Sequence, residues 1–446
     1  MSPVSRRHML AAGSLGLAGA LATPAAARAA RAAEPSPVLD ARSLSLIPDS
    51  PEDQSGALQQ ALAAAAREDT PLFLPAGRYR VSGIVMEAPV SLFGSPGRTI
   101  LQQSGSRNLL SLTGPHIRLS DLVLDGARAA LDGALLRAEA ADDLRLTGLE
   151  IRNSADGGIG LIRCSGSVTG CTLAEIANVA LFALDSRGLE IHGNRIADIG
   201  NNGIQVWRSA AGEDATAVFN NRIERIRADA GGSGQNGNGI NVFRAGSVSV
   251  RDNRITDCAF TAVRVNAGSN AQIIGNSCAR LGEVALYAEF GFQGAVISDN
   301  LVDTAALGIS ITNFNEGGRL AVCSGNLIRN LFTRTEGEPR GIGIAVEADA
   351  AITGNVVENA PRAGIMVGWG RYQRSVAVTG NMIRDTRWGI AASVAPGAGR
   401  VLIGQNMLSD CSEGAIIGHQ NGRAVTPDLM AARDLPGNLT VTGNSA

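Results

Sequence analysis

The sequence predicts an all-β protein, a parallel β-helix in which each coil supplies three short strands, with an α-helical cap at its N-terminal end. Two repeated patterns indicate this fold. The first is an Asn followed by one variable and one apolar residue, recurring every 23 to 32 residues. Its copies begin at Asn194, Asn221, Asn253, Asn276, Asn300, Asn326, Asn355, Asn381 and Asn406. The second is a Gly-Ile-x-Val-like segment between consecutive copies, with the period-two alternation of strands.

Other repeat architectures of similar period fit less well. Leucine-rich repeats need a leucine framework and a helix or 3₁₀ turn in each unit, and neither is visible. Propeller blades need about 40 residues and four strands. A parallel β-helix fits the observed period, with coils stacked about 4.8 Å apart.

The repeated Asn is expected at a tight corner between two strands. Asn tolerates the left-handed conformation that such a corner requires, and the Gly that often precedes it favours the same bend. Its side-chain amide can bond to the Asn of the coils above and below, so we expect a ladder of stacked amides rather than a ligand contact at these positions.

Residues 1–32 have the features of an export signal. Arg6 and Arg7 precede an Ala/Gly/Leu-rich stretch that ends on small residues, which is typical of a cleavable signal. The paired arginines resemble the twin-arginine signal, so the expected partner is that export machinery and the expected location is periplasmic or secreted. An ordinary secretory signal is the alternative. No later stretch reaches the ~20 apolar residues of a membrane span.

The rest of the chain divides into a cap region, 35–115, and a repeat region, 116–446, with an atypical last coil. In the cap region, an Ala/Leu/Gln-rich stretch predicts one amphipathic helix to about Arg67, with Asp53 or Ser55 as its N-cap. This helix is expected to cover the open end of the first coil, because the end coils of a solenoid need a cap.

Composition excludes several kinds of site. The net charge is −2, which argues against a nucleic-acid partner, and all 39 basic residues are arginines, which excludes a lysine Schiff base and a P-loop. The six cysteines form no C-x-x-C pair and are interpreted as buried thiols, with a zinc site or disulfides as the alternative.

The opening of the chain also resembles a known superfamily. The segments ALQQALAAAA, LFLPAGRY and VSLFGSPGRTIL are similar to the start of right-handed, pectate-lyase-like β-helix proteins. Together with the twin-arginine signal, the repeats resemble a narrower family of exported repeat proteins of uncharacterised function. The resemblance implies a right-handed β-helix whose Gly-Ile-x-Val strand face, flanked by loops, carries the site in the enzymes of the superfamily.

On this face, the third and fifth residues of each motif are expected to point outward. They are Gln205 and Trp207, Asn241 and Phe243, Arg264 and Asn266, Tyr287 and Glu289, Ser310 and Thr312, Gly343 and Ala345, Met366 and Gly368, and Ala391 and Ser393. Insertions at 227–239 and 330–341 are expected to wall a groove along these residues. The predicted polysaccharide contacts are Trp207, Asn241, Phe243, Asn266, Phe314 and Trp369.

The leading enzymatic hypothesis is a polysaccharide lyase or C5-epimerase. Arg264, Tyr287 and Glu289 are the candidate catalytic residues, with Arg264 also able to bind a uronate carboxylate. His419 is a further available base, and Glu289 is a candidate ligand of calcium, the one cofactor considered. A glycosidase ranks lower, because Glu289 and Glu347 are expected roughly 12 Å apart, beyond the ~6.5 to 9.5 Å of an inverting pair.

Two alternatives remain open. Arg264 and Glu289 can simply form a surface salt bridge, about 8 Å apart between Cα atoms. The protein can also be non-catalytic, either a carbohydrate-binding protein or a structural protein of the cell surface or periplasm. Convergent acid and base groups in the groove favour an enzyme, whereas aromatic and amide groups alone favour binding.

Overall fold

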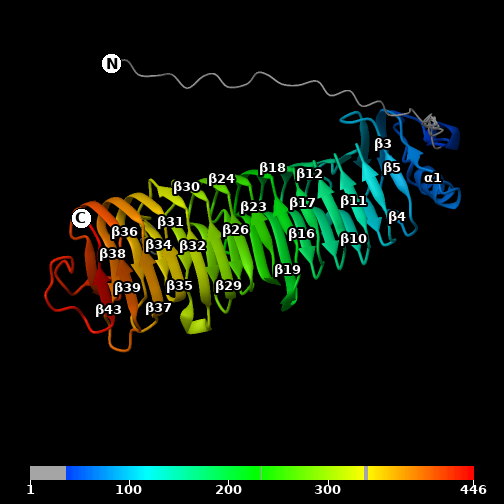
Figure 1. The fold of residues 1–446 in the computed structure, drawn as a ribbon. Coiled ribbons are helices and arrows are strands. Elements are labelled where there is room, and N and C mark those ends of the chain that lie inside the picture. Colours follow the sequence, from blue (N-terminus) through cyan, green and yellow to red (C-terminus); the bar gives the residue numbers. More distant parts are fainter. Residues whose placement is uncertain (1–36, 233, 336–339) are drawn as a thin grey trace, which may run out of the picture. The chain divides into compact units, whose positions relative to one another are not determined.

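The computed structural model describes residues 37–232, 234–335 and 340–446, and residues 37–446 form one compact unit. The predicted signal segment, 1–32, lies outside the described residues. The described chain winds as a parallel β-solenoid, with one α-helix near its N-terminal end (Figure 1). The predicted fold is therefore confirmed.

Each full coil contributes one strand to each of three faces. Face 1 holds the Gly-Ile-x-Val strands: β4 (Ile84–Met86), β7 (Leu110–Leu112), β10 (Ala134–Glu139), β13 (Gly157–Ile162), β16 (Val179–Leu184), β19 (Asn202–Glu213), β22 (Asn238–Gly246), β25 (Val263–Asn266), β28 (Val284–Glu289), β31 (Leu307–Ile311), β34 (Ile342–Val346), the C-terminal parts of β36 (Val356–Val367) and β38 (Met382–Ser393), and β41 (Ile416–Gln420).

Face 2 holds the strands that follow the repeated Asn: β3 (Gly77–Val81), β6 (Thr99–Gln103), β9 (Val123–Asp125), β12 (Glu150–Ser154), β15 (Thr172–Ile176), β18 (Arg195–Ile199), β21 (Arg222–Ile226), β24 (Arg254–Cys258), β27 (Ser277–Leu281), β30 (Leu301–Asp303), β33 (Leu327–Arg329), the N-terminal parts of β36 and β38, and β40 (Met407–Cys411).

Face 3 holds the strands that precede the repeated Asn: β1 (Leu39–Asp40), β2 (Leu72–Phe73), β5 (Ser91–Phe93), β8 (Arg118–Ser120), β11 (Leu144–Thr147), β14 (Gly166–Thr169), β17 (Glu190–His192), β20 (Ala217–Phe219), β23 (Ser249–Arg251), β26 (Ala271–Ile274), β29 (Gln293–Ser298), β32 (Arg319–Ser324), β35 (Ala348–Thr353), β37 (Arg374–Thr379), β39 (Val401–Gly404) and β43 (Leu439–Thr442). The pairs on the three faces are parallel, and β42 (Arg423–Ala424) adds a short antiparallel pair to β41.

The core lies inside the coils. Alternate residues of each strand point inward, so Ile and Val side chains such as Ile204 and Val206 stack on their equivalents in the next coil and are fully buried. Because the interior is shared between coils, each coil depends on its neighbours for its buried surface.

Helix α1 (Ser55–Arg67) caps the N-terminal end and buries Leu58, Ala61 and Leu62 in the core. Its N-cap is Gln54, so the predicted cap at Asp53 or Ser55 is wrong by one residue. Gln54 is held there because its side-chain amide bonds both the backbone N–H and the backbone C=O of Ile47. The short 3₁₀ helices η1 (Ala41–Leu44) and η2 (Phe314–Glu316) complete the helical content of the described residues.

The predicted amide ladder is confirmed. From Asn194 onward, each Asn donates its side-chain N–H to the side-chain oxygen of the next at 2.9 to 3.0 Å, and Asn444 ends the series. The predicted backbone of the Asn is wrong. The left-handed conformation belongs to the residue before it, with φ of 68° at Gly193 and 57° at Asp252. The Asn is thereby left free to point its amide into the corner, where it satisfies buried backbone groups.

Five of the six cysteines are buried, Cys411 is half-buried, and all six are free thiols, as the sequence predicted. Among the described residues, no helix is long and apolar enough to cross a membrane.

Candidate functional site

The strand pairing of face 1 places one outward column of side chains along the solenoid. In register, this column runs through Trp207, Phe243, Asn266, Glu289, Thr312, Glu347, Gly368, Ser393 and His419. The prediction that Gly343 and Ala345 are the outward pair of their coil is wrong by two residues. Ser310 pairs with Ala345, so the outward pair is Ala345 and Glu347. We call this series the Glu column.

Placing Glu347 in the Glu column shortens the expected distance between the two glutamates. Glu289 and Glu347 share the Glu column, two coils apart, so their Cα atoms are separated by about 9.6 Å rather than the expected 12 Å. The error arose because the sequence offers Gly341-Ile342 and Gly343-Ile344 as alternative motif starts. The pairing of Ile309 with Ile344 selects the second of these.

Aromatic rings occupy the part of face 1 that is formed by β16, β19 and β22. The Trp207 ring contacts Phe182 edge-on with ring centroids 5.5 Å apart, and it contacts Phe243 at 5.6 Å. Its indole N–H donates to Asn241 Oδ1 at 3.2 Å. The predicted contacts Trp207, Asn241 and Phe243 therefore lie together, and much of their surface is turned toward one another.

The central part of the face is a buried ionic cluster. Arg264 donates to both carboxylate oxygens of Glu289, at 2.5 and 3.0 Å, and Asn266 donates to the same carboxylate at 3.1 Å. One carboxylate oxygen of Glu283 lies 3.0 Å from the Arg340 guanidinium, and the other lies 3.9 Å from the Arg264 guanidinium. The side chains of Arg264 and Glu289 are only 12% and 2% exposed. The predicted surface salt bridge is thus a buried one.

Two features enclose this cluster. Gly234, in the 227–239 insertion, has its Cβ position directly against the Arg264 guanidinium. The Tyr287 ring lies 5.2 Å from the Arg264 guanidinium and 6.0 Å from that of Arg340. Burial raises the pKa of Glu289 above its usual value although Arg264 lowers it, and burial likewise raises the pKa of Tyr287.

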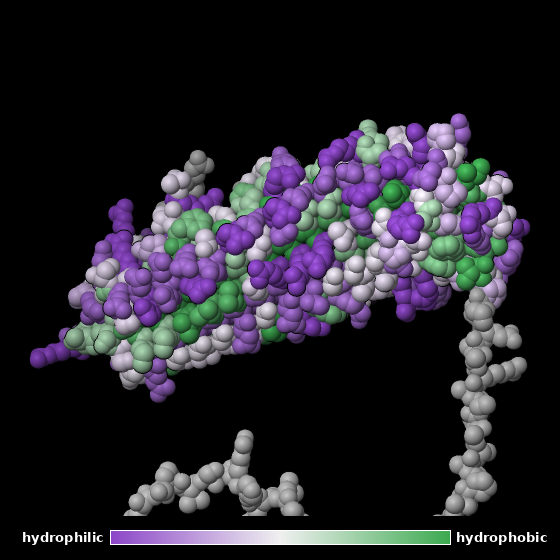
Figure 2. Space-filling model, turned by 90° about the horizontal axis from the view of Figure 1, so that it is seen from above, coloured by the Kyte–Doolittle hydropathy of each residue, from purple (hydrophilic) through white to green (hydrophobic). Residues whose placement is uncertain are grey.

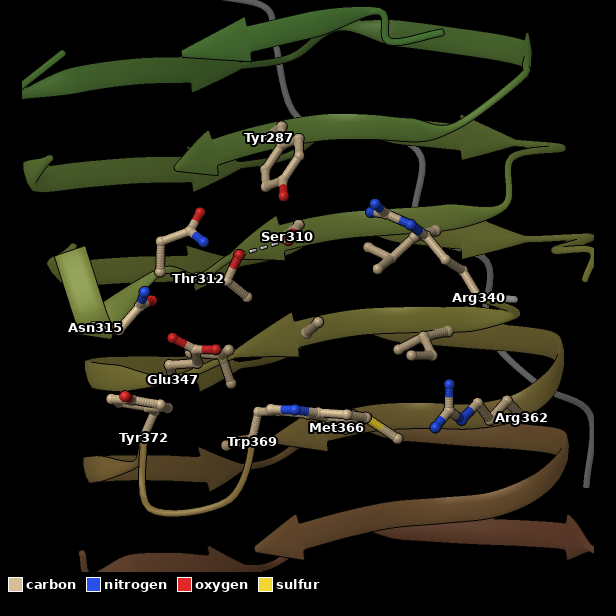
Figure 3. Close-up of a pocket in the computed structure, with 16 residues that line it drawn as sticks. Tyr287, Ser310, Thr312, Asn315, Arg340, Glu347, Arg362, Met366, Trp369 and Tyr372 are labelled. Atoms are coloured by element: carbon tan, nitrogen blue, oxygen red, sulfur yellow. Dashed lines mark hydrogen bonds between the residues drawn. The ribbon is translucent and has the colours of Figure 1, made fainter. Parts of the chain in front are cut away.

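A cleft of about 690 Å³ opens immediately beyond Tyr287 (Figure 3). Its floor is made of small or flexible side chains, Ser310, Ala345 and Met366. Tyr287 bounds one end, and Trp369 and Tyr372, on a hairpin at the end of a face-1 strand, bound the other. In the floor, the coils from Ser310 to Met366 are successive neighbours, so the cleft runs along the solenoid axis.

The two sides of the cleft differ in charge. Arg340 and Arg362 lie along one side, and Asn315 and Glu347 lie along the other (Figure 3). Arg340 is held in place by Glu283 and by the Tyr287 ring. Among the described lining residues, Glu347 is the one carboxylate.

Glu347 is held differently from Glu289. One of its oxygens accepts the backbone N–H of Phe314 at 2.6 Å, and no ion pair joins it to a cation within the described part of the chain. Burial raises its pKa above the usual glutamate value. A carboxyl group of this kind is suited to hold and release a proton.

The remaining predicted residues lie in different surroundings. Trp369 lines the cleft, and Phe314 flanks it with the Arg374 guanidinium over its ring at 4.6 Å. The prediction that His419 is an available base is wrong, because it is fully buried. Gly422 donates to its Nδ1, so Nε2 carries the proton and donates to the Val367 carbonyl; burial lowers its pKa to about 4.

Sequence reasoning missed two cleft residues, Arg340 and Arg362, and considered Glu347 only as a partner of Glu289 in a glycosidase. Counting the repeat from Gly343 would have placed Glu347 at an outward position of the face. A calcium ion does not fit at Glu289, because Arg264 and Asn266 already bond its oxygens. Among the described residues, no group of three or more His, Cys, Asp or Glu side chains is arranged to hold a metal ion.

Comparison with known proteins agrees with this architecture. A family model described as a right handed beta helix region matches residues 202–383. Residues 202–383 are therefore similar to right handed beta helix regions, in agreement with the parallel solenoid of the described chain. A sequence search of curated proteins found no match.

Solved structures share the solenoid at low sequence identity. The bacteriophage phi29 gene product 12 N-terminal fragment is 15% identical, covers 90% of this chain and 73% of its own, and has a TM-score of 0.54. The A-module of Azotobacter vinelandii mannuronan C-5 epimerase AlgE4 is 15% identical over 91% of this chain and 100% of its own, with a TM-score of 0.44. A Yersinia enterocolitica family 28 exopolygalacturonase is 13% identical over 92% and 77%, with a TM-score of 0.45. The similarity to the phi29 fragment shows the fold alone.

Proposed function

We propose that the cleft between Tyr287 and Tyr372 binds a stretch of anionic polysaccharide. The observation that carries this proposal is the arrangement of Arg340 and Arg362 along one side of a cleft whose end is formed by Trp369 and Tyr372. Guanidinium groups bind carboxylates or sulfates through paired hydrogen bonds, and aromatic faces pack on the apolar faces of sugar rings.

The dimensions suit this ligand. A volume of about 690 Å³ lies within the range of ligand-binding clefts. The floor spans three coil steps from Tyr287 to Met366, which is about 14 Å along the solenoid. An extended polymer lying along the axis would therefore contact the aromatic end and the arginine side at once.

Modification of the bound polymer is a second candidate function, favoured by Glu347. Elimination or epimerisation at a uronate needs a base, a proton donor and a group that neutralises the carboxylate. Arg340 and Arg362 supply the cations, and Glu347, whose carboxylate is made more basic by the burial that raises its pKa, is suited to act as the base. The hydroxyl of Tyr287 faces Ser310 across the floor in Figure 3, and because burial raises its pKa the hydroxyl keeps its proton and is the candidate proton donor.

We also propose that the protein acts outside the cytoplasm after twin-arginine export, on the strength of Arg6-Arg7 and the stretch that follows them. This proposal is independent of the cleft and is tested by fractionation of cells that carry Arg6→Ala, Arg7→Ala. Retention of the double variant in the cytoplasm is expected, and export of the variant at the normal level would contradict it.

The binding test compares retention on immobilised polyuronate, sulfated glycan and neutral dextran. We expect retention on a polyanion, at least tenfold weaker in Trp369→Ala and in Tyr372→Ala and unchanged in Trp207→Ala, an aromatic variant outside the cleft. Equal retention of all variants, or none on any polyanion, would overturn the proposal. In the same samples, ultraviolet absorbance of unsaturated uronates that disappears in Glu347→Gln would identify elimination.

A further inference from the structure

Exposed apolar side chains are concentrated on the C-terminal coils, away from the cleft. Of the thirteen large hydrophobic residues exposed within the described ranges, eight lie on faces 2 and 3 of these coils: Val296, Leu301, Leu320, Val322, Leu327, Met382, Leu402 and Met407. Figure 2 shows hydrophobic surface in a band over this half of the solenoid. Concentration of this kind on a soluble surface indicates a contact with another molecule.

Most of these residues form two columns in strict register. On face 2, the column consists of Leu301, Leu327, Val356, Met382 and Met407. On face 3, it consists of Val296, Val322, Ala351, Ala377 and Leu402. The two columns flank the Asn corner, and each spans four coil steps, or about 19 Å. We call the two together the apolar double column.

The fold itself does not require this surface. In the more N-terminal coils, the face-2 column holds Arg195, Arg222 and Arg254, and the face-3 column holds Glu190 and Gln272. The same backbone positions are therefore compatible with charged and polar side chains. The change from polar to apolar residues needs a cause outside the solenoid's own packing.

A second column on face 2 indicates what covers the apolar one. Beside it, Asp303, Arg329, Glu358 and Arg384 follow one another in successive coils, with alternating charge. Read in reverse order, this series has the opposite charge at every position. A second copy lying antiparallel would place a positive charge against every negative one, whereas a copy in parallel at the same height would place like charges together.

We propose that the apolar double column is the interface of a homodimer in which two solenoids pack antiparallel about a two-fold axis. The axis passes between the Arg329 and Glu358 rows of face 2. Leu301 then lies opposite Met382 of the partner subunit, and Asp303 lies opposite Arg384 of the partner subunit. Such an interface is isologous, because the same surface serves both copies, and it closes after two subunits.

The proposed interface leaves the cleft accessible. The cleft is on face 1, and the columns are on faces 2 and 3, so each subunit keeps its own polysaccharide site. This inference is independent of the proposed function, and its failure leaves the cleft untouched.

The test is light scattering of the full chain during size-exclusion chromatography over a range of concentrations. Twice the chain mass is expected for the wild type. Leu327→Glu, Met382→Glu should weaken the dimer at least a hundredfold, and the matched control Arg222→Glu, on the same column in the polar coils, should leave it intact. A monomer at every concentration, a trimer, or a dimer that survives the double variant would overturn the proposal.

Charge reversal tests the antiparallel orientation. Arg384→Glu should weaken the dimer about tenfold by placing two carboxylates together, and adding Asp303→Arg should restore it, because each reversed group again meets its opposite. Circular dichroism melts of each variant monitor folding. Failure of the double reversal to restore the dimer, with folding intact, would exclude this orientation.

Discussion

Glu289 and Glu347 occupy the same column of the same face, two coils apart, and their surroundings are opposite. Glu289 is almost fully buried and bonded on both oxygens by Arg264. Glu347 lines an open cleft and accepts one backbone N–H, from Phe314. The pKa of each is raised by burial, so that property does not separate them.

Position in a repeat fixes the direction of a side chain and not its role. The role is set by the loops and by the neighbouring coils. The 227–239 insertion covers Arg264, so the Arg264–Glu289 pair is enclosed structure. Beside Glu347 the neighbouring outward residues are Ser310, Thr312 and Ala345, which are too small to fill the space and leave a cleft.

Replacement of Arg264, in the enclosed ionic cluster, should have the largest effect on the free energy of unfolding. Arg264→Ala leaves Glu289 buried without its cation, and breaking a buried pair in this way costs about 3 to 5 kcal/mol of unfolding free energy. Chemical denaturation measures it. The control is Arg280→Ala, which breaks the exposed pair with Asp257 and should cost under about 1 kcal/mol. Equal losses in the two variants would show that Glu289 is not enclosed.

His419 is a further buried titratable group, at the C-terminal end of the Glu column. Burial lowers its pKa from 6.5 to about 4, so the unfolded chain takes up the proton more readily than the folded one. Stability is therefore lost as the pH falls from about 6.5 to about 4, by about 3 kcal/mol at the low end. His419→Gln should flatten this part of the pH profile. A profile unchanged by His419→Gln would contradict the buried neutral form.

The fold was predictable because its causes are local and repeated. The Asn ladder, the inward Ile and Val residues and the cap helix each leave a periodic or compositional trace in the sequence. The errors lie where two local patterns compete. Gly341-Ile342 and Gly343-Ile344 satisfy the motif equally, and only pairing with Ile309 decides between them.

The candidate site was predictable only in part. The outward positions of Arg264, Tyr287 and Glu289 were predicted correctly, because alternation fixes which side chains point outward. The enclosure of Arg264 could not be predicted from the sequence, because it depends on where the 227–239 insertion folds. Arg340 and Arg362 were missed because neither belongs to the repeated motif: Arg340 precedes β34, and Arg362 lies within β36 where the pairing register shifts.

The smallest effect on stability is expected at Glu347, which lines the open cleft. Because the pKa of Glu347 is raised on folding, the folded chain holds that proton more tightly than the unfolded chain, and stability falls as the pH rises through the folded pKa. Glu347→Gln removes this loss and keeps an oxygen to accept the Phe314 N–H. The variant should therefore match the wild type at pH 4 and equal or exceed it at pH 8. Glu289→Gln, its matched control, should instead be less stable than the wild type, because it leaves Arg264 buried without its counter-charge. If Glu347→Gln were the less stable variant at pH 8, Glu347 would be a structural carboxylate like Glu289, and the base proposed for the cleft would have to be sought elsewhere.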